Sequence, residues 1–322
     1  MYWSFLANTI LPENASNQVA SVNSIEPIEE ESMIPDFVVM TFAGDIMMDR
    51  GVEASVNKNF KGDFTQLFNN FSMFKNDDIS FANLEGPVSD VGRNVGSKYS
   101  FRMDPKIIPV LKDSGIDIVS FANNHVGDYT VKAFVDTLNR LNTAGILFAG
   151  GGANYTEATT PTVIEKNNIK SCYLAYSDVG PNWLKATEST PGILIASDKN
   201  FANTIASAKV NCDVLVVSFH WGDEYKPHNT RQATLAHTAI DNGADIIVGH
   251  HPHVPQDLEL YKGKPIMYSL GNFMFDQSWS KPTMQGMIVQ MKVYKDGSAT
   301  DIKQYTSQQN KFFQIESVTE KL

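Results

Sequence analysis

Short apolar runs rich in β-branched residues alternate with segments of helical spacing along most of this chain. The runs predict buried strands, and they read FVVMTFAG, ISFANLE, IDIVSFANNH, ILFAG, DVLVVSFHWG and ADIIVGHHPH. Helices are expected between them, over residues 64–74, 105–114, 131–143, 199–210 and 230–242. A hairpin is predicted over residues 162–177, and the last third of the chain predicts further strands. The alternation favours an α/β fold with a largely parallel sheet, to which these additional strands contribute antiparallel pairs.

Chain length and charge narrow the classes of protein to consider. The chain has 322 residues, enough to bury a substantial core without a disulfide framework. Its two cysteines, Cys172 and Cys212, each lie in an apolar run, and we expect buried free thiols rather than a bridge. With 26 Lys and Arg against 36 Asp and Glu, the net charge is −10, which argues against nucleic acid as a partner. An anionic substrate would need a locally positive site, supplied by metal ions or a few basic side chains.

The first 36 residues differ in composition from the rest, and we interpret residues 37–322 as one folded domain. The N-terminal sequence MYWSFLANTIL is apolar but too short to span a membrane, and it lacks a basic n-region. It is either the remnant of a signal or anchor helix or a disordered end. Residues 12–35 are rich in Asn, Ser and Glu, which predicts a linker.

Five of the predicted strands end in side chains that are typical metal ligands. The carboxyl ends of parallel strands open into a shared crevice, so we expect these side chains to lie together. Carboxylates and neutral imidazoles bind Zn, Mn and Fe, and two ions can hold both reacting oxygens of a displacement. Three imidazoles within four residues would be costly to bury without partners. The sequence therefore predicts a site for one or two divalent ions, built from Asp45, Glu85, Asn123, Asn124, His125, His220, His250, His251 and His253.

Taken singly, most of these residues also have an ordinary structural interpretation. Asp45 could cap a helix that begins near residue 48, and Glu85 could start a turn. Asn124 and His125 could hydrogen-bond a loop backbone, and His220 could be a satisfied core histidine. The joint pattern favours the metal site over these separate explanations.

Seven motifs strengthen that prediction, in the order GDIMMDR, ANLEGPVSD, KYSFRMDP, GIDIVSFANNHVGDY, FHWGDEY, NGADIIVGHHPHV and YSLGNFMFD. As a set, covering residues 37–276, they resemble the CapA-type capsule (poly-γ-glutamate) synthesis proteins, within the calcineurin-like metallophosphoesterase superfamily. The resemblance implies a four-layer α/β/β/α sandwich with a dinuclear-type site at one end of its two sheets.

The resemblance also implies roles for individual residues. Asp45 and His253 would bind the first metal, and Glu85 would bridge the two. The second metal would be held by Asn124, His220 and His251, with His250 either behind them or exchanging roles with His251. His125 would contact and protonate the leaving group.

Two positions depart from the hydrolytic members of that superfamily. Their first strand usually carries Asp-x-His, and here Met47 occupies the His position, where a thioether is a poor ligand for Zn or Mn. Glu85 stands where Asp is usual, which lengthens the bridge by one methylene. Both changes weaken the expected binding of the first ion and argue against ordinary phosphatase activity.

The remaining motif residues are predicted to support the site. Arg50, Arg102 and Lys98 could supply a positive patch for phosphate or an anionic polymer, or could be surface residues. Asp128 and Glu224 could orient nearby histidines, and Arg50 and Asp128 join His125 in the predicted catalytic group. Asn272 is expected to form a turn near the site. His228 and His237 are assigned structural roles.

The predicted function is that of a metal-binding protein in the biosynthesis or handling of a capsular anionic polymer, poly-γ-glutamate, and a metal-dependent hydrolase if catalytic. One alternative is a non-catalytic polymer-binding or assembly subunit, and another is a phosphoesterase acting on small phosphate esters. Membrane-bound polymer synthase subunits are expected partners. An extracytoplasmic location, membrane-anchored or at the cell surface, is favoured over a cytoplasmic one.

Overall fold

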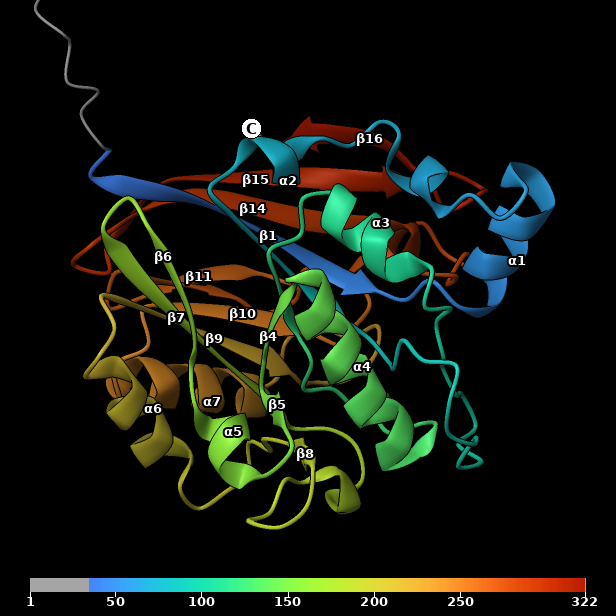
Figure 1. Cartoon of the computed structure of the whole chain (residues 1–322). Coiled ribbons are helices and arrows are strands. Elements are labelled where there is room, and N and C mark those ends of the chain that lie inside the picture. The colour runs from blue at the N-terminus through green and yellow to red at the C-terminus, as the bar shows by residue number, and fades with distance from the viewer. Residues whose placement is uncertain (1–34, 322) are drawn as a thin grey trace, which may run out of the picture. The chain divides into compact units, whose positions relative to one another are not determined.

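The computed structural model describes residues 35–321, so the anchor or signal segment predicted for the first residues, and nearly all of the linker, lie outside the described part. Two β-sheets face each other, and helices cover the outer face of each (Figure 1). This arrangement confirms the predicted four-layer α/β/β/α sandwich. Within residues 35–321, no helix is both long and apolar enough to cross a membrane.

The first sheet combines a parallel half with an antiparallel half. β1, β2, β3 and β4 run parallel, while β14, β15 and β16 pair antiparallel beyond β1. The strand order is β16 (Ile315–Glu320), β15 (Ala299–Gln309), β14 (Gln285–Tyr294), β1 (Phe37–Ile46), β2 (Ile79–Leu84), β3 (Ile118–Ser120) and β4 (Leu147–Ala149), with β13 (Asn272–Met274) also parallel to the end of β1.

The second sheet has a parallel centre with an antiparallel strand at each edge. Its order is β11 (Leu258–Tyr261), β12 (Lys264–Met267), β10 (Ile246–His250), β9 (Val214–His220), β7 (Ile169–Ser177) and β6 (Thr162–Lys166). The β6–β7 pair is the predicted hairpin. A small additional sheet pairs β5 (Gly151–Gly152) with β8 (Gly192–Ile193).

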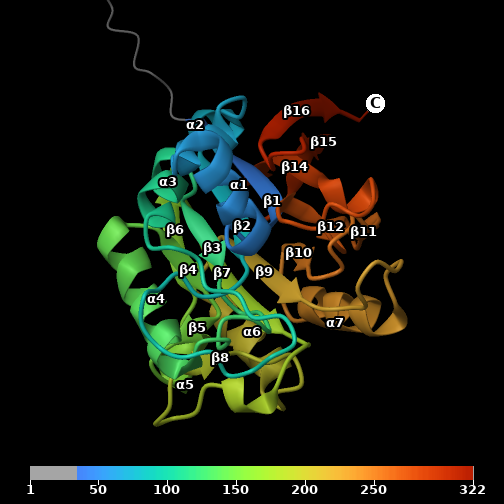
Figure 2. The ribbon, with the colours of Figure 1, turned by 90° about the vertical axis from the view of Figure 1, so that its right-hand side faces the viewer.

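The helices are α1 (Arg50–Phe60), α2 (Met73–Asn76), α3 (Ile107–Asp113), α4 (Thr130–Ala144), α5 (Tyr155–Thr159), α6 (Phe201–Lys209) and α7 (Thr230–Asp241), with 3₁₀ turns at Phe64–Phe68, Asn182–Leu184 and Pro282–Met284. The helices predicted over residues 105–114, 131–143, 199–210 and 230–242 are confirmed to within a few residues as α3, α4, α6 and α7, whereas α1 and α5 were not predicted. Figure 2 shows α3 and α4 on one side of the sheets and α7 on the other.

The single helix predicted over residues 64–74 is wrong, because a 3₁₀ turn and the short α2 occupy this stretch instead. Asn69 and Asn70 lie between the two, and asparagine favours turns over helix interiors. Phe71 and Phe74 beyond the turn both pack against Phe273, with ring centroids 5.1 and 5.4 Å apart. The periodic spacing of the phenylalanines therefore reflects a shared packing partner rather than one helix.

Alternating side chains along the central strands divide the hydrophobic core into two layers. In β9, Val214 and Val216 belong to the cluster between the sheets, whereas Leu215 and Val217 pack with residues of α6 and α7. A strand buried on both faces reads as a continuous apolar run, which explains the sequence DVLVVSF.

Cys172 and Cys212 form a disulfide, so the expectation of two free thiols is wrong. Cys172 lies in β7, and Cys212 follows α6 just before β9. The parallel pairing of β7 with β9 returns the chain beside its starting point and places the two Cα atoms 5.8 Å apart, within bridging range. Their separation of 40 positions in the sequence conceals this proximity.

Candidate metal centre

Strand ends from both sheets converge, and six of the predicted site residues come together there. Asp45 near the end of β1 is paired in register with Asn83 of β2, and Glu85 directly follows β2. His220 ends β9 beside His250 at the end of β10. All six are buried, and we call them the strand-end cluster: Asp45, Glu85, His220, His250, His251 and His253.

Asp45 lies at the centre of the cluster. Its Oδ1 is 3.3 Å from Nδ1 of His250, and its Oδ2 is 3.3 Å from Nδ1 of His253. The side-chain amide of Asn83 donates to Oδ1 at 2.9 Å, and the backbone N–H of His251 donates to Oδ2 at 3.3 Å. Burial opposes the charge on Asp45, but the two neighbouring imidazoles outweigh it and hold the pKa of this carboxyl well below its usual value.

Glu85 is the second buried carboxylate, and one of its oxygens has no partner within residues 35–321. Oε1 lies 3.7 Å from Nε2 of His253 and 3.9 Å from Nε2 of His125, without a hydrogen bond to either. Asn83 donates to Oε2 at 3.4 Å. Burial raises the pKa of Glu85 well above its usual value, although the charge of His253 opposes the rise, and the nearby Asp45 adds to it.

Two histidines of the cluster have left-handed backbone conformations, with φ of 96° at His251 and 59° at His253. Such conformations are strained for residues other than glycine and concentrate at functional sites. His253 Nδ1 lies 3.0 Å from Oδ1 of Asn272, which β13 places beside Asp45. Burial alone would lower the pKa of His253, but the charges of Glu85 and Asp45 raise it to about 9.

Burial keeps neutral two imidazoles that the second sheet contributes, His220 at the end of β9 and His251 directly after β10. Burial, together with the charge of His251, holds the pKa of His220 well below its usual value. Burial and the charge of His253 lower the pKa of His251 to about 3. His220 Nε2 lies 2.8 Å from Oδ1 of Asn124, so these two predicted ligands pair with each other. Neutral imidazole is the form that binds metals.

Two overlapping sets of donor atoms have the composition and spacing of a metal site. Asp45, Glu85 and His253 bring ligand atoms within 4.8 Å of one another, and so do Glu224, His251 and His253. Several buried atoms that could bind a metal ion make no hydrogen bond within the described part of the chain. They are Glu85 Oε1, both ring nitrogens of His250 and His251 Nδ1. Orphaned buried atoms of this kind are costly unless something binds them. The donor set therefore fits one or two divalent ions.

Glu224 lies closer to this centre than the sequence predicted. It was expected to orient a histidine, whereas its carboxylate belongs to one of the two donor sets. The next residue, Tyr225, has a left-handed backbone with φ of 61°, and its N–H donates to the carbonyl of Pro252. This turn holds Glu224 and the histidine triplet against each other, and nothing in the sequence indicates it.

His125 adjoins the cluster without joining either donor set. Its Nδ1 lies 2.7 Å from Oδ2 of Asp128, and its ring packs on Phe101 with centroids 4.0 Å apart. Asp128 also accepts a hydrogen bond from the backbone N–H of Phe101 at 2.9 Å. Asp128 thus fixes the ring so that Nε2 is directed toward Glu85.

A pocket of about 300 Å³ opens beside the cluster, and we call it the His253 pocket. It is lined by Arg50, Tyr99, Phe101, His125, Glu224, Tyr225, His253, Gln277 and Trp279. Within the described part of the chain, Arg50 is the only Lys or Arg that lines it, and the guanidinium is paired with Asp276 and lies over the Phe101 ring. The positive charge of Arg50 is therefore already neutralised by Asp276.

The other two predicted basic residues do not line this pocket. Arg102 stacks on Tyr129 at 4.3 Å from the ring centroid, and Lys98 is exposed with its Nζ 5.0 Å from the Tyr99 ring. The basic patch predicted from Arg50, Arg102 and Lys98 is thus not assembled at the cluster.

Met47 lies in an apolar cluster with Phe101 and Phe275, and its Sδ accepts a hydrogen bond from the N–H of Asp49. Asp49, rather than Asp45, caps α1, so the helix-cap alternative for Asp45 is wrong. The side chain of Met47 packs against rings that contact His125 and His253.

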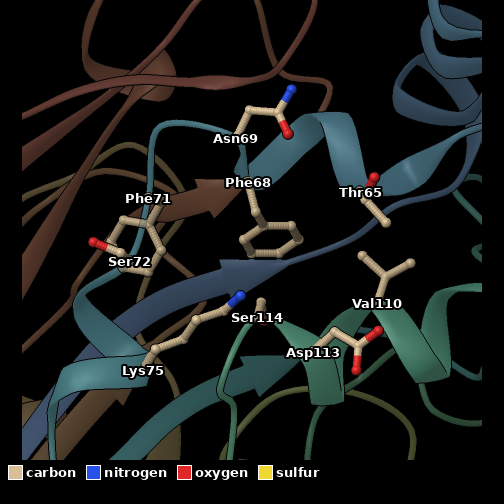
Figure 3. Close-up of a pocket in the computed structure, with 9 residues that line it drawn as sticks. All are labelled: Thr65, Phe68, Asn69, Phe71, Ser72, Lys75, Val110, Asp113 and Ser114. Carbon is tan, nitrogen blue, oxygen red and sulfur yellow. The ribbon is translucent and has the colours of Figure 1, made fainter.

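The two histidines assigned structural roles lie outside the cluster. His228 stacks on Tyr268 and lies 3.3 Å from Asp257, while His237 stacks on Tyr261 and pairs with Glu259 at 3.0 Å. A separate pocket of about 360 Å³, shown in Figure 3, contains none of the predicted site residues among its lining residues.

Sequence reasoning missed Asn83, whose amide contacts both buried carboxylates. The available signal was its position two residues before Glu85 in the predicted strand ISFANLE, because alternate residues of a strand share a face. Asn83 Oδ1 in turn accepts a hydrogen bond from Asn123, which links the ends of β2 and β3.

Comparison with known proteins identifies close relatives. A family model described as bacterial capsule synthesis protein PGA_cap matches residues 39–277. The PGA biosynthesis protein CapA of Bacillus subtilis (strain 168) is 35% identical over 82% of this chain and 70% of its own length. The capsule biosynthesis protein CapA of Bacillus anthracis is 33% identical over 88% of this chain and 70% of its own. Among solved structures, the calcineurin-like phosphoesterase YfkN from Bacillus subtilis aligns with 88% of this chain and 90% of its own, at 14% identity and a TM-score of 0.48.

Proposed function

We propose a function from the premise that this chain belongs to the PGA_cap family of bacterial capsule synthesis proteins. The proposed function is metal-dependent hydrolysis of an anionic capsular polymer, poly-γ-glutamate, during its synthesis or handling. One observation carries the proposal: the buried Glu85 Oε1, which has no hydrogen-bond partner within residues 35–321, lies 3.9 Å from Nε2 of His125, and a pocket opens beside them.

The proposed ligands are the members of the two donor sets, Asp45, Glu85, His253, His251 and Glu224, with His220 and Asn124 adjoining them. Ions of Mn, Zn or Fe suit such mixed carboxylate and imidazole donors. A divalent ion bound here would supply a Lewis acid for the scissile carbonyl group.

The chain's own residues would manage the proton and the position of the substrate. His125, with Nδ1 held by Asp128, would deliver a proton from Nε2 to the leaving amine. The proposed role of Arg50 is to hold the pocket wall, through Asp276 and the Phe101 ring.

Met47 favours a second candidate, a non-catalytic subunit that binds the polymer or assembles its synthase. The sulfur of Met47 is engaged by the N–H of Asp49, so the position offers no donor in place of the usual histidine. With one ligand fewer, the centre could retain its ion for recognition alone.

An extracytoplasmic location is part of the proposal, with membrane-bound synthase subunits as partners. The Cys172–Cys212 disulfide supports it, because such bonds persist in oxidising compartments and are rare in the cytosol. The names of the capsule biosynthesis relatives support a role at the cell surface.

Turnover by the metal-loaded protein tests the proposal. We expect new amine ends from γ-glutamyl oligomers, little release from a generic phosphodiester, and loss of turnover after chelation. His125→Ala should lower kcat by about 10²–10⁴-fold while keeping its metal. His228→Ala is the matched control. Metal and polymer binding without turnover would establish the second candidate and overturn the hydrolase.

A further inference from the structure

A second pocket is lined by residues of the same segment that carries His125. This pocket, of about 520 Å³, has Asn124 and Asp128 in its wall, whereas His125 lines the His253 pocket. We call it the Trp183 pocket, and its remaining lining residues are Val95, Gly96, Ser97, Thr130, Val131, Pro181 and Trp183. Residues 124–128, next to the candidate metal centre, therefore contribute to the walls of both pockets.

Each pocket carries a tryptophan that is at least half exposed. Trp183 is 50% exposed and Trp279 is 64% exposed, although large aromatic side chains are normally covered. Both rings are supported from behind. A Cβ atom at Gly127 would lie 2.5 Å from the Trp183 ring, so the glycine allows the indole to rest on the segment. Trp279 meets Tyr225 edge to face at 5.8 Å.

Neither pocket offers a free cation to an anionic chain. Within residues 35–321, no Lys, Arg or His lines the Trp183 pocket, and its one carboxylate, Asp128, is paired with His125. In the His253 pocket the guanidinium of Arg50 is paired with Asp276, and the two lining histidines each face a carboxylate, His125 that of Asp128 and His253 that of Asp45. Away from the metal centre, affinity must therefore come from contacts other than ion pairs.

We propose that the two pockets form one groove for an extended γ-glutamyl chain, with Trp183 and Trp279 as platforms for its methylene groups. This inference rests on the proposed function. A γ-linked repeat carries two methylenes in its main chain and holds its carboxylate to the side. The methylenes can lie on an indole face while the carboxylates stay in water or face the metal centre, as the stems of long charged side chains do.

Binding of oligomers of different length tests the groove. The probes are a γ-glutamyl dimer and a long γ-glutamyl oligomer, titrated calorimetrically into the full chain with Mn²⁺ present, under conditions where assay of new amine ends shows no cleavage during the titration. Trp183→Ala and Trp279→Ala should each weaken binding of the long oligomer roughly tenfold and leave the dimer unchanged, because burial of about two methylenes is lost. Trp183→Phe should restore most of the affinity. Leu260→Ala, at an exposed residue outside both pockets, is the matched control.

Different failures have different meanings. Equal affinity of the wild type for the dimer and the long oligomer, with the tryptophan variants unaffected, would overturn the groove and leave the hydrolysis proposal standing. An α-linked oligomer that binds as tightly as the γ-linked one would overturn the methylene contacts. Failure of the metal-loaded wild type to bind any γ-glutamyl ligand would overturn the proposed function itself.

Discussion

Replacing Glu85 with Gln should stabilise the metal-free protein and abolish its stabilisation by metal. Glu85 is fully buried, its Oε1 has no partner in the described part of the chain, and Asp45 lies close by. The glutamine carbonyl can still accept the hydrogen bond from Asn83. The substitution therefore removes a buried negative charge that the folded chain stabilises poorly, together with a proposed metal ligand.

The two expected effects are of similar size and opposite sign. A buried polar group without a partner costs about 1–3 kcal/mol, which Glu85→Gln should recover in the metal-free protein. Metal at a hundredfold excess over its dissociation constant stabilises the wild type by about 2.7 kcal/mol, which the variant should lose. Because burial raises the pKa of Glu85 above 4.5, its destabilising charge develops as the pH rises from that value. The gain should therefore be larger at neutral pH than in acid.

Thermal unfolding with chelator and with Mn²⁺ measures both effects. Each kcal/mol should move Tm by roughly 2–4 °C in a domain of this size. Glu165→Gln, at an exposed residue of β6, is the matched control and should change neither value. A Glu85→Gln protein that is less stable than the wild type in chelator, or that keeps the full shift with Mn²⁺, would refute this reasoning.

Three further predictions concern other residues. The pKa of His253 rises from 6.5 to about 9 on folding, so the metal-free protein should lose up to about 3 kcal/mol of stability as the pH increases through this range. Denaturant unfolding at a series of pH values measures this loss, and a stability that does not change with pH would contradict the prediction. Met47→His places an imidazole beside the centre, so metal analysis should find a further bound ion, and an unchanged metal content would show that the side chain does not reach the site. Replacing Cys172 and Cys212 with Ser opens a loop of 40 residues and should lower the free energy of unfolding, measured with denaturant, by about 4 kcal/mol. Alkylation of two thiols in the native wild type would disprove the disulfide.

The sandwich and the position of the cluster were predictable because the signals are local. An apolar run that ends in Asp45 or His220 identifies both a strand and its polar end. The parallel topology then brings such ends together without further information. The same reasoning placed His250, His251 and His253 at the end of one strand.

The features that the sequence did not reveal depend on contacts between distant segments. The disulfide forms because β7 and β9 are neighbours, which the apolar runs around Cys172 and Cys212 do not indicate. Glu224 reaches the histidines through the left-handed turn at Tyr225, a conformation that tyrosine rarely adopts. The neutralisation of Arg50 depends on Asp276, which is far along the chain.

Metal content tests the central claim, that the strand-end cluster is a divalent metal site, most directly. The wild type, the double variant His251→Ala with His253→Ala, and the control His228→Ala with His237→Ala would be purified identically, loaded with Mn²⁺ or Zn²⁺, desalted and analysed by mass spectrometry of the elements. The cluster predicts one or two ions per chain in the wild type and the control, and none in the His251/His253 double variant. Equal metal content in all three proteins would contradict the claim.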